Sequence, residues 1–340
     1  MKIITYINGQ NEERVGLVCD GQVVDFAHAA GELGQEEWSK MRLFLNNLPD
    51  TYNAALAIEK SFKKGLVKAV PDQLDSKILA PVPHPPSCRD AYAFRQHVAA
   101  ARKNRGLEMN LEFDQFPVFY FTNHHGIVGP GDIVVEEDHL QKLDFELEVA
   151  VVIGKKGRNI DAKDADQYVF GLTIMNDFSA RQLQMEEMQM SLGPAKGKDF
   201  ATAIGPWLVT MDELEPFKIT TPFGNKYDLE MKAFHNGKLV SKGNMKDMNW
   251  TFAEIIERAS YGVDLFPGDV IGSGTVGTGC YLELNGTWAR EAKEAGKDFT
   301  PVWLKDGDII ELEVTGLGRL TNRIIKSKES RSILKKKKNV

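Results

Sequence analysis

The sequence predicts an α+β, β-rich protein with one large domain and a smaller domain ahead of it. Three observations predict this fold class. Short apolar runs with strand-like alternation dominate the chain, helical periodicity is confined to a few segments, and neither a βαβαβ rhythm nor an internal repeat is visible. The chain has 340 residues, of which 42% are hydrophobic, so it is long enough to bury a large core.

Residues 1–80 are expected to form the small N-terminal domain. Within residues 1–30, short strands separated by turns at Asn8-Gly9 and at Gly21 predict a small β module. Residues 36–68 carry a helical pattern. The stretch PVPHPPS at residues 81–87 has four prolines in seven positions, which indicates a linker or an extended entry into the next domain.

The larger, catalytic domain is expected to span residues 81–330. A helix is predicted at FRQHVAAARKNRG, ending on Gly106, and a second at SARQLQMEEM. Strands are predicted at PVFYFT, GDIVV, DFELEVAVVIG and YVFGLTIM, and further strands with glycine and proline turns extend to about residue 325. Residues 331–340 form a basic tail, and its run from Lys335 to Lys338 is interpreted as a frayed, solvated end.

Charge and cysteine content exclude several classes of function. A net charge of −6 argues against a general binder of nucleic acid or of acidic membranes. The three cysteines, Cys19, Cys88 and Cys280, lie far apart, which favours a reduced, cytoplasmic compartment and structural thiols. The first residues lack the apolar region of a signal peptide, and no run approaches 18 apolar residues, so no membrane partner is expected.

Two familiar cofactor motifs are incomplete. The segment GSGTVG at residues 272–277 satisfies G-x-G-x-x-G, but a dinucleotide site needs a helix directly after it. The following TGCYLELNGTW alternates like a strand, so a glycine-rich turn between two strands is expected. The seven histidines form no HExxH motif and no close cluster with cysteine, which argues against a zinc site.

The strand-like segment KLDFELEVAVV at residues 142–152 places three carboxylates on one face. Asp144, Glu146 and Glu148 alternate with apolar residues, and side chains i, i+2 and i+4 of a strand share a face. A hard divalent cation would relieve their mutual repulsion and prefers carboxylate oxygens as ligands. The alternative is a solvated edge strand, which the apolar run that follows disfavours.

Spacing alone leaves other polar candidates open. Asp177 stands between a predicted strand and a predicted helix, where it would serve as an N-cap. Asp177, Arg181 and Gln184 nevertheless line one helix face at i, i+4 and i+7. By spacing alone, His97 would be a structural histidine on a helix and Lys198 an ordinary surface lysine.

Several longer stretches resemble the fumarylacetoacetate hydrolase family. CRDAYAFRQH at residues 88–97 is similar to the D-x-Y-x-x-R-Q-H segment of fumarylacetoacetases. The other stretches keep the family's order over roughly residues 85–325: DFELEVAVVIG, FGLTIMNDFSARQLQ, SLGPAKGKDFATAIGPWL, NMKDMNWTFAEII, LFPGDVIGSGTVG and GCYLEL. The resemblance implies the family's catalytic domain, a mixed β-sandwich or β-roll, behind an SH3-like N-terminal domain.

The resemblance also implies a divalent metal site and a homodimer. The cation expected is Mg²⁺ or Ca²⁺, with Mn²⁺ as a third candidate. Asp144 matches no ligand of the family, and we expect it to be hydrogen-bonded or solvated. The residues that match the family's metal ligands are Asp90, Glu146, Glu148 and Asp177.

Catalytic and substrate-binding residues follow from the same resemblance. His97 matches the general base and Glu283 the carboxylate that orients it. Three further residues match groups that hold the substrate and stabilise its developing charge: Lys198, Arg181 and Gln184. Positions that match other substrate contacts are Tyr92, Tyr120 and Thr275.

The activity implied is metal-dependent hydrolysis of a carbon–carbon bond in a β-diketo acid, within aromatic-compound or tyrosine catabolism. His97 would activate water while the metal stabilises the enolate leaving group. Fumarylacetoacetases of the animal type have a substrate-binding arginine where this chain has Gly106, so both fumarylacetoacetate and a related acylpyruvate remain candidate substrates. The alternative is a decarboxylase, hydratase or isomerase of a 2-oxo acid at the same site. A non-catalytic protein of this fold is disfavoured because both metal-ligand and acid–base positions are intact.

Overall fold

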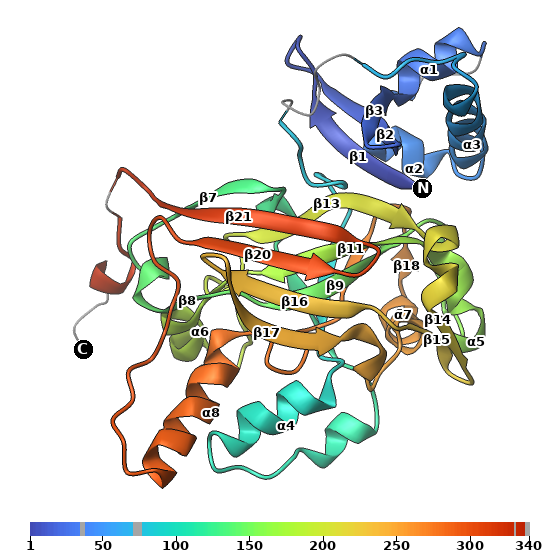
Figure 1. The fold of residues 1–340 in the computed structure, drawn as a ribbon. Coiled ribbons are helices and arrows are strands. Elements are labelled where there is room, and N and C mark those ends of the chain that lie inside the picture. Colours follow the sequence, from blue (N-terminus) through green and yellow to red (C-terminus); the bar gives the residue numbers. More distant parts are fainter. Residues whose placement is uncertain (35–37, 71–76, 330, 337–340) are drawn as a thin grey trace.

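The larger of two main β-sheets has ten strands and includes the N-terminal strands (Figure 1). This computed structural model describes residues 1–34, 38–70, 77–329 and 331–336. Nine strands follow one another in the order β3 (Gln22–Asp25), β2 (Glu13–Cys19), β1 (Lys2–Ile7), β13 (Thr202–Thr210), β11 (Val169–Asp177), β9 (Leu147–Ile153), β19 (Val270–Gly272), β4 (Cys88–Ala91) and β5 (Phe119–Thr122), and β6 (Ile127–Val128) pairs with β13.

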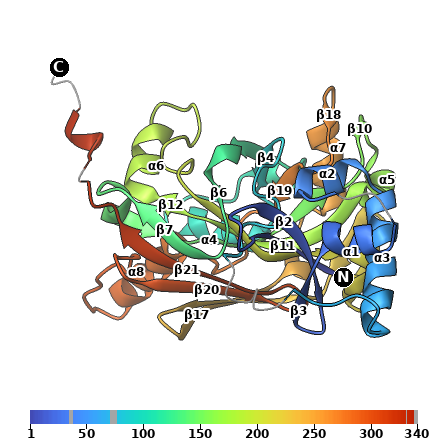
Figure 2. The same cartoon turned by 90° about the horizontal axis from the view of Figure 1, so that it is seen from above.

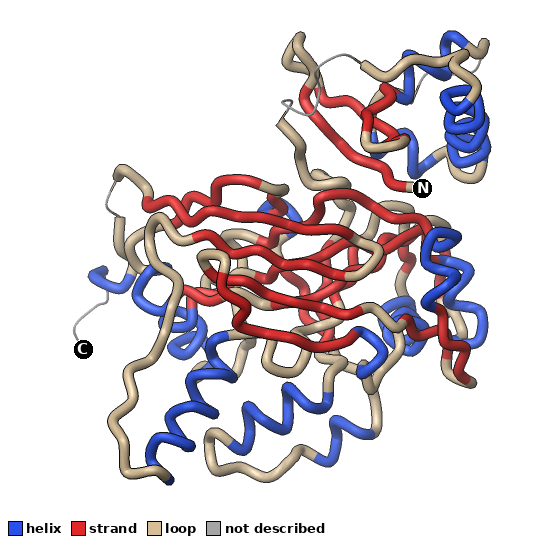
Figure 3. The backbone as a smooth tube through the Cα atoms, viewed as in Figure 1, coloured by secondary structure: helices blue, strands red, loops and turns tan. Residues whose placement is uncertain are grey.

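The second sheet has five strands and encloses the main core together with the first. Val149 and Val151 of β9 lie in one buried apolar cluster with Leu312 of the second sheet. Strands fill the centre of the molecule and helices lie at its periphery (Figure 3), which confirms the predicted α+β, β-rich fold. The order in the second sheet is β17 (Lys238–Asn244), β16 (Glu230–His235), β20 (Ile309–Val314), β21 (Gly318–Lys326) and β7 (Gly131–Val135). Three two-stranded sheets pair β10 (Gly157–Arg158) with β18 (Asp264–Leu265), β12 (Ser179–Ala180) with β8 (Leu143–Asp144), and β14 (Lys218–Thr221) with β15 (Gly224–Tyr227).

Eight α-helices are assigned in the described residues, and three of them belong to the N-terminal part. Figures 1 and 2 show α1 and α3 at the end of the molecule opposite α6. None of these helices is long and apolar enough to cross a membrane, within the part of the chain that the structure describes. The helices are α1 (Phe26–Glu32), α2 (Met41–Asn46), α3 (Asp50–Lys63), α4 (Arg95–Lys103), α5 (Ala162–Ala165), α6 (Arg181–Met188), α7 (Phe252–Ser260) and α8 (Tyr281–Glu294).

The N-terminal strands continue the sheet of the larger domain. β1 pairs antiparallel with β13, with Lys2 opposite Val209. On the other face of the sheet, Phe44 of α2 and Ile58 of α3 share a buried cluster with Val152 of β9. The boundary near residue 80 and the SH3-like character of the first domain stay predictions. Residues 36 and 37 of the predicted helical stretch lie outside the described residues.

One predicted strand is a helix. The segment after GSGTVG forms the start of α8, so the expected turn between two strands is wrong. The backbone amides of Tyr281 and Leu282 donate to the carboxylate of Asp144, at 2.7 and 2.9 Å. A negative charge at the first turn favours a helix because the free amides point at it. Asp144, which is far from α8 in the chain, therefore stabilises the first turn of this helix.

Two further segments differ from the expectation. The strand predicted from residue 144 is interrupted, because β8 ends at Asp144 and β9 begins at Leu147. The described part of the C-terminal tail is docked rather than frayed, since the backbone amides of Ile333 and Leu334 donate to the carboxylate of Asp138. Lys337 and Lys338 lie outside the described residues.

Candidate active site

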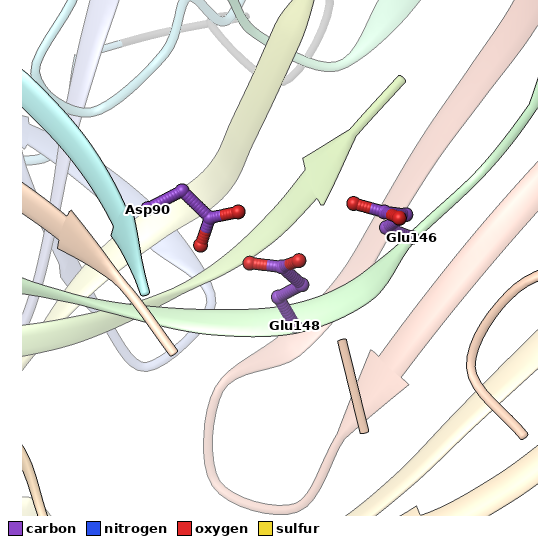
Figure 4. Close-up of side chains that lie close together, drawn as sticks. All are labelled: Asp90, Glu146 and Glu148. Carbon is purple, nitrogen blue, oxygen red and sulfur yellow. The ribbon is translucent and has the colours of Figure 1, made fainter. Parts of the chain in front are cut away.

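Three buried carboxylates lie close together in the interior (Figure 4). Asp90 belongs to β4, Glu148 belongs to β9, and Glu146 lies directly before β9. One oxygen of each carboxylate lies within 4.8 Å of the others. All three side chains are at least nine-tenths buried, so their charges are poorly screened by solvent.

Glycine makes this convergence sterically feasible. β19 lies between β4 and β9 in the sheet, and a Cβ atom on its Gly272 would stand 2.5 Å from Asp90 Oδ1. Two residues later the amide of Gly274 donates to the same oxygen at 3.0 Å. On the other side, the side-chain oxygen of Asn176 accepts a hydrogen bond from the amide of Glu146 at 2.9 Å, where the strand is interrupted.

A buried lysine connects two of the predicted metal ligands. Lys198 Nζ donates to a carboxylate oxygen of Glu146 and, at 2.7 Å, to Asp177 Oδ2. The hydroxyl of Tyr120 donates to the same oxygen of Asp177. Asp177 is therefore adjacent to the cluster, but it is not among the three carboxylates that meet within 4.8 Å.

A buried arginine neutralises the remaining carboxylate of the strand. Arg181 donates to Asp144 Oδ2 at 2.8 Å, to Glu146 Oε1 at 2.7 Å and to Gln184 Oε1 at 2.9 Å. Asp144 is fully buried and also accepts the first amides of α8. It is thus hydrogen-bonded rather than solvated, and its role is to hold Arg181 and the start of α8 in place.

The carboxylates of the site differ in their proton affinity. Burial raises the pKa of Glu148 well above its ordinary value, and the neighbouring carboxylates raise it further. Burial and the charge of Asp177 raise the pKa of Asp90 to about 8. Burial would also raise the pKa of Glu146, but Lys198 and the nearby arginine lower it to about 2. Positive charge therefore compensates Asp90 and Glu148 less than it compensates Glu146.

The donor set fits a hard divalent cation. Glu148 Oε2 and Asp177 Oδ1 are buried and accept no hydrogen bond in the structure. Either a bound proton or a cation would satisfy each of these atoms, and a bound cation favours the ionised form of the carboxylates around it. Oxygen ligands with an excess of negative charge are those that Mg²⁺, Ca²⁺ and Mn²⁺ prefer.

A histidine–glutamate pair forms the second part of the site. His97 on α4 and Glu283 on α8 are buried, and Nδ1 of the ring lies 2.6 Å from Glu283 Oε2. The other oxygen of Glu283 accepts the amide of Thr278 at 3.0 Å. The ring of Tyr92 stands edge-on to His97, with 5.8 Å between ring centroids. Nε2 of His97 makes no hydrogen bond to any described residue, which leaves it available to a water molecule or a substrate.

The loop of residues 273–279 joins the two parts. Along this loop, the amide of Gly274 donates to Asp90, the hydroxyl of Thr275 donates to Glu148 at 3.3 Å, and the amide of Thr278 donates to Glu283. Gly274 has φ +78°, which suits glycine. Sequence reasoning named Thr275 and interpreted GSGTVG as a glycine-rich turn, but it did not identify Thr278 or the contacts of this loop with both groups.

The structure therefore places every predicted site residue in one of two neighbouring groups. Their roles as ligands, base and substrate contacts stay predictions. Two cavities of about 240 and 290 Å³ lie elsewhere, between Gln167 and Asp212, and none of the predicted site residues lines them. The buried polar network is what identifies the site.

Comparison with known proteins agrees with this geometry. The family model described as "Fumarylacetoacetate (FAA) hydrolase C-terminal" matches residues 87–325. A fumarylacetoacetase from Oryza sativa subsp. japonica is 29% identical over 350 residues, covering 86% of this chain and 79% of that protein. An oxaloacetate tautomerase from Bacillus subtilis is 33% identical over 258 residues, covering 73% of each.

A solved structure shares the fold at lower identity. The maleylpyruvate hydrolase from Sphingobium sp. SYK-6, in complex with manganese(II) and pyruvate, is 22% identical with a TM-score of 0.66, covering 96% of this chain and 100% of that one. Fold and site thus define a class of β-rich enzymes that contains hydrolases and tautomerases. The chain belongs to the fumarylacetoacetate hydrolase family.

Proposed function

We propose that this protein is a metal-dependent hydrolase that cleaves a carbon–carbon bond in a β-diketo acid, either fumarylacetoacetate or a related acylpyruvate. The observation that carries the proposal is the buried His97–Glu283 pair, held by one loop next to a carboxylate cluster. Hydrolysis needs both parts, because water must lose a proton as it attacks and the leaving carbon must accept an electron pair.

The residues that would hold the metal are Asp90, Glu146, Glu148 and Asp177. Their buried oxygens without donors and their excess of negative charge support this assignment. Mg²⁺, Ca²⁺ and Mn²⁺ all suit an oxygen-only set. When bound, such a cation supplies Lewis-acid polarisation of the oxygens of the diketone.

His97 acts as the general base in this proposal. The carboxylate of Glu283 can only accept at Nδ1, so it stabilises the tautomer that carries its proton there. Nε2 then has a free lone pair and can take a proton from water. After the transfer, the negative charge of Glu283 stabilises the imidazolium, as in the base-and-orienter pairs of hydrolytic triads.

Lys198 and Arg181 supply positive charge where the substrate becomes more negative. Lys198 uses two of its three N–H donors on Glu146 and Asp177, which leaves one for a substrate oxygen. Because both cations are buried and ion-paired, they need little reorganisation when the charge develops. Loss of one such donor typically lowers kcat by about 10²- to 10³-fold.

A second candidate is tautomerisation or isomerisation of a 2-oxo acid at the same site. It is favoured by the similarity to the Bacillus subtilis oxaloacetate tautomerase, which is 33% identical over 73% of this chain, against 29% over 86% for the fumarylacetoacetase. Proton shuttling at a metal-bound oxo acid would use the same carboxylate cluster. It would not require a base dedicated to water, which is why the His97–Glu283 pair favours hydrolysis.

The deciding experiment is a substrate panel. Metal-loaded enzyme is incubated with fumarylacetoacetate, several acylpyruvates and the enol form of oxaloacetate, with a His97→Ala variant beside it. Two acids released from one diketone by the wild type but not by the variant would support hydrolysis, and the order of rates would identify the substrate. Absence of cleavage together with fast tautomerisation or loss of CO₂ would refute it.

The remaining parts of the proposal rest on the resemblance to the family. They are a homodimer and a place in aromatic-compound or tyrosine catabolism. The proposed cytoplasmic location rests instead on the three separated cysteines, which favour a reduced compartment. Light scattering of the purified protein tests the homodimer directly, since a mass of one 38.0 kDa chain would contradict it.

A further inference from the structure

Lys198 is delivered to the site by a short glycine-rich segment. Residues 193–199 read GPAKGKD, and the amides of Lys198 and Asp199 both donate to the carbonyl of Ala195 at 3.0 Å. Before this turn, the segment is strongly exposed: Met190 is 78% and Leu192 93% accessible.

Glu187 at the end of α6 fixes the turn from outside. Its carboxylate accepts three consecutive backbone amides, those of Ala195 at 2.9 Å, Lys196 at 2.7 Å and Gly197 at 3.1 Å. Hydrogen bonds to an ionised acceptor are stronger than neutral ones, and a row of amides aimed at one point forms an anion-binding nest. The side chain of Glu187 fills that nest.

The same turn is packed directly onto α6. A Cβ atom on Gly197 would stand 2.6 Å from the backbone nitrogen of Gln184, so only glycine allows this approach. The carbonyl of Gly197 also accepts the amide of Ala180 at 2.8 Å. Arg181, Gln184 and Glu187 lie on one short helix, α6. This helix therefore carries two predicted substrate contacts, and its Glu187 binds the turn that precedes Lys198.

We propose that Glu187 is a positioning residue that holds the turn of residues 195–197, and through it the ammonium of Lys198, at the carboxylates of Glu146 and Asp177. Glu187 itself touches neither the carboxylate cluster nor the histidine. This inference deepens the proposed function and rests on it for the catalytic role of Lys198. The positional role of Glu187 stands on the three amide contacts alone.

The test compares Glu187→Gln with Glu186→Gln. Both glutamates are half-buried on the same helix, and the three amides of the turn donate to Glu187, whereas Glu186 accepts from the side chain of Gln182. Glutamine offers one acceptor oxygen and an amino group that opposes the backbone amides, so the clamp is weakened. Glu187→Asp is a second variant that keeps the charge but shortens the reach.

The first readout does not depend on any reaction. The folded protein is acetylated briefly with acetic anhydride, and Lys198 and Lys196 are quantified by mass spectrometry in one peptide. In the wild type, Lys198 is 4% exposed and protected, whereas the Lys196 side chain is 57% exposed and reacts. We expect the ratio of Lys198 to Lys196 labelling to rise severalfold in Glu187→Gln, less in Glu187→Asp, and not in Glu186→Gln. Unchanged protection in both Glu187 variants would overturn the proposal.

The second readout separates positioning from a general loss of stability. We expect kcat of Glu187→Gln to fall by about 10²-fold at unchanged metal content, because small displacements of a charged group cost that much. In a Lys198→Met background, the same change should add no further loss, since Glu187 acts only through Lys198. Additive losses would place its effect elsewhere and refute the inference. If the wild type cleaves no diketone, the proposed function is refuted. The labelling ratio would still show whether Glu187 positions Lys198.

Discussion

Replacing Glu283 by glutamine tests the catalytic pair with one changed atom. In the wild type both oxygens of Glu283 accept hydrogen bonds, one from the amide of Thr278 at 3.0 Å and one at Nδ1 of His97 at 2.6 Å. A backbone amide can only donate, so the single oxygen of glutamine must turn toward Thr278. Its amino group then faces Nδ1 and donates to it. This arrangement forces the ring proton onto Nε2, the atom that should accept a proton from water.

The expected magnitude follows from the loss of the working tautomer. The corresponding aspartate-to-asparagine change in a serine-protease triad lowers kcat by about 10⁴-fold, which corresponds to about 5 kcal/mol of transition-state stabilisation. We expect Glu283→Gln to lose between about 10²- and 10⁴-fold in kcat, because the protein can rescue part of the pair by reorienting the ring. Metal content should not change, since Glu283 lies outside the carboxylate cluster.

The assay is kcat at saturating β-diketo acid, with metal content measured on the same samples and His97→Ala made in both backgrounds. If His97 and Glu283 act as a unit, the double variant should be no slower than His97→Ala alone. Turnover within about threefold of the wild type in Glu283→Gln would refute the tautomer argument, because a wrong tautomer cannot act as base.

Three other predictions concern the base and the metal. His97→Ala should abolish turnover but leave bound Mn²⁺ nearly unchanged, whereas loss of the metal, measured by elemental analysis, would make its role structural. The double change Glu146→Gln with Glu148→Gln should remove both metal and turnover, and unchanged metal content would contradict the ligand assignment. The metal-free protein should lose stability as pH rises from about 5 to 8, because the raised pKa values of Asp90 (about 8) and Glu148 make the folded state bind protons that the unfolded state has already released. Thermal melts of chelator-treated and Mn²⁺-loaded protein measure this, and a metal-free form that gains stability over that range would refute the pKa argument.

Local patterns predicted the fold class but not the long-range pairing. The alternation and apolar runs that predicted strands at DFELEVAVVIG and YVFGLTIM correspond to β9 and β11. The junction of β1 with β13 joins Lys2 to Val209 and has no local signature in either strand. The start of α8 was misread for a similar reason: GCYLEL alternates like a strand, and the group that makes it helical, the carboxylate of Asp144, lies 137 residues away.

The site was predicted in composition more fully than in arrangement. Residue types and resemblance identified the carboxylates, the histidine and the lysine, because each lies within a recognisable stretch of sequence. Neither showed that Lys198 bridges Glu146 and Asp177, which are 52 and 21 residues away along the chain. Alternation predicted that Asp144 shares a face with Glu146 and Glu148. In the structure the strand breaks after β8, and Asp144 binds Arg181 and the start of α8 instead. Contacts of this kind depend on tertiary packing, which overrides local periodicity.

The glycine-rich loop between β19 and α8 explains why the two halves of the site can work together. A base is useful only if it stands in a fixed relation to the polarised substrate, since small displacements reduce the rate strongly. Gly274 and Thr275 contact the carboxylates, while Thr278, three residues later, contacts the carboxylate that orients His97. A side chain at Gly272 would collide with Asp90, so β19, which leads into the loop, can lie this close to Asp90 only because it ends with glycine. The motif that resembles a dinucleotide-binding loop in sequence thus leads into a loop that contacts both the carboxylate cluster and the carboxylate paired with His97.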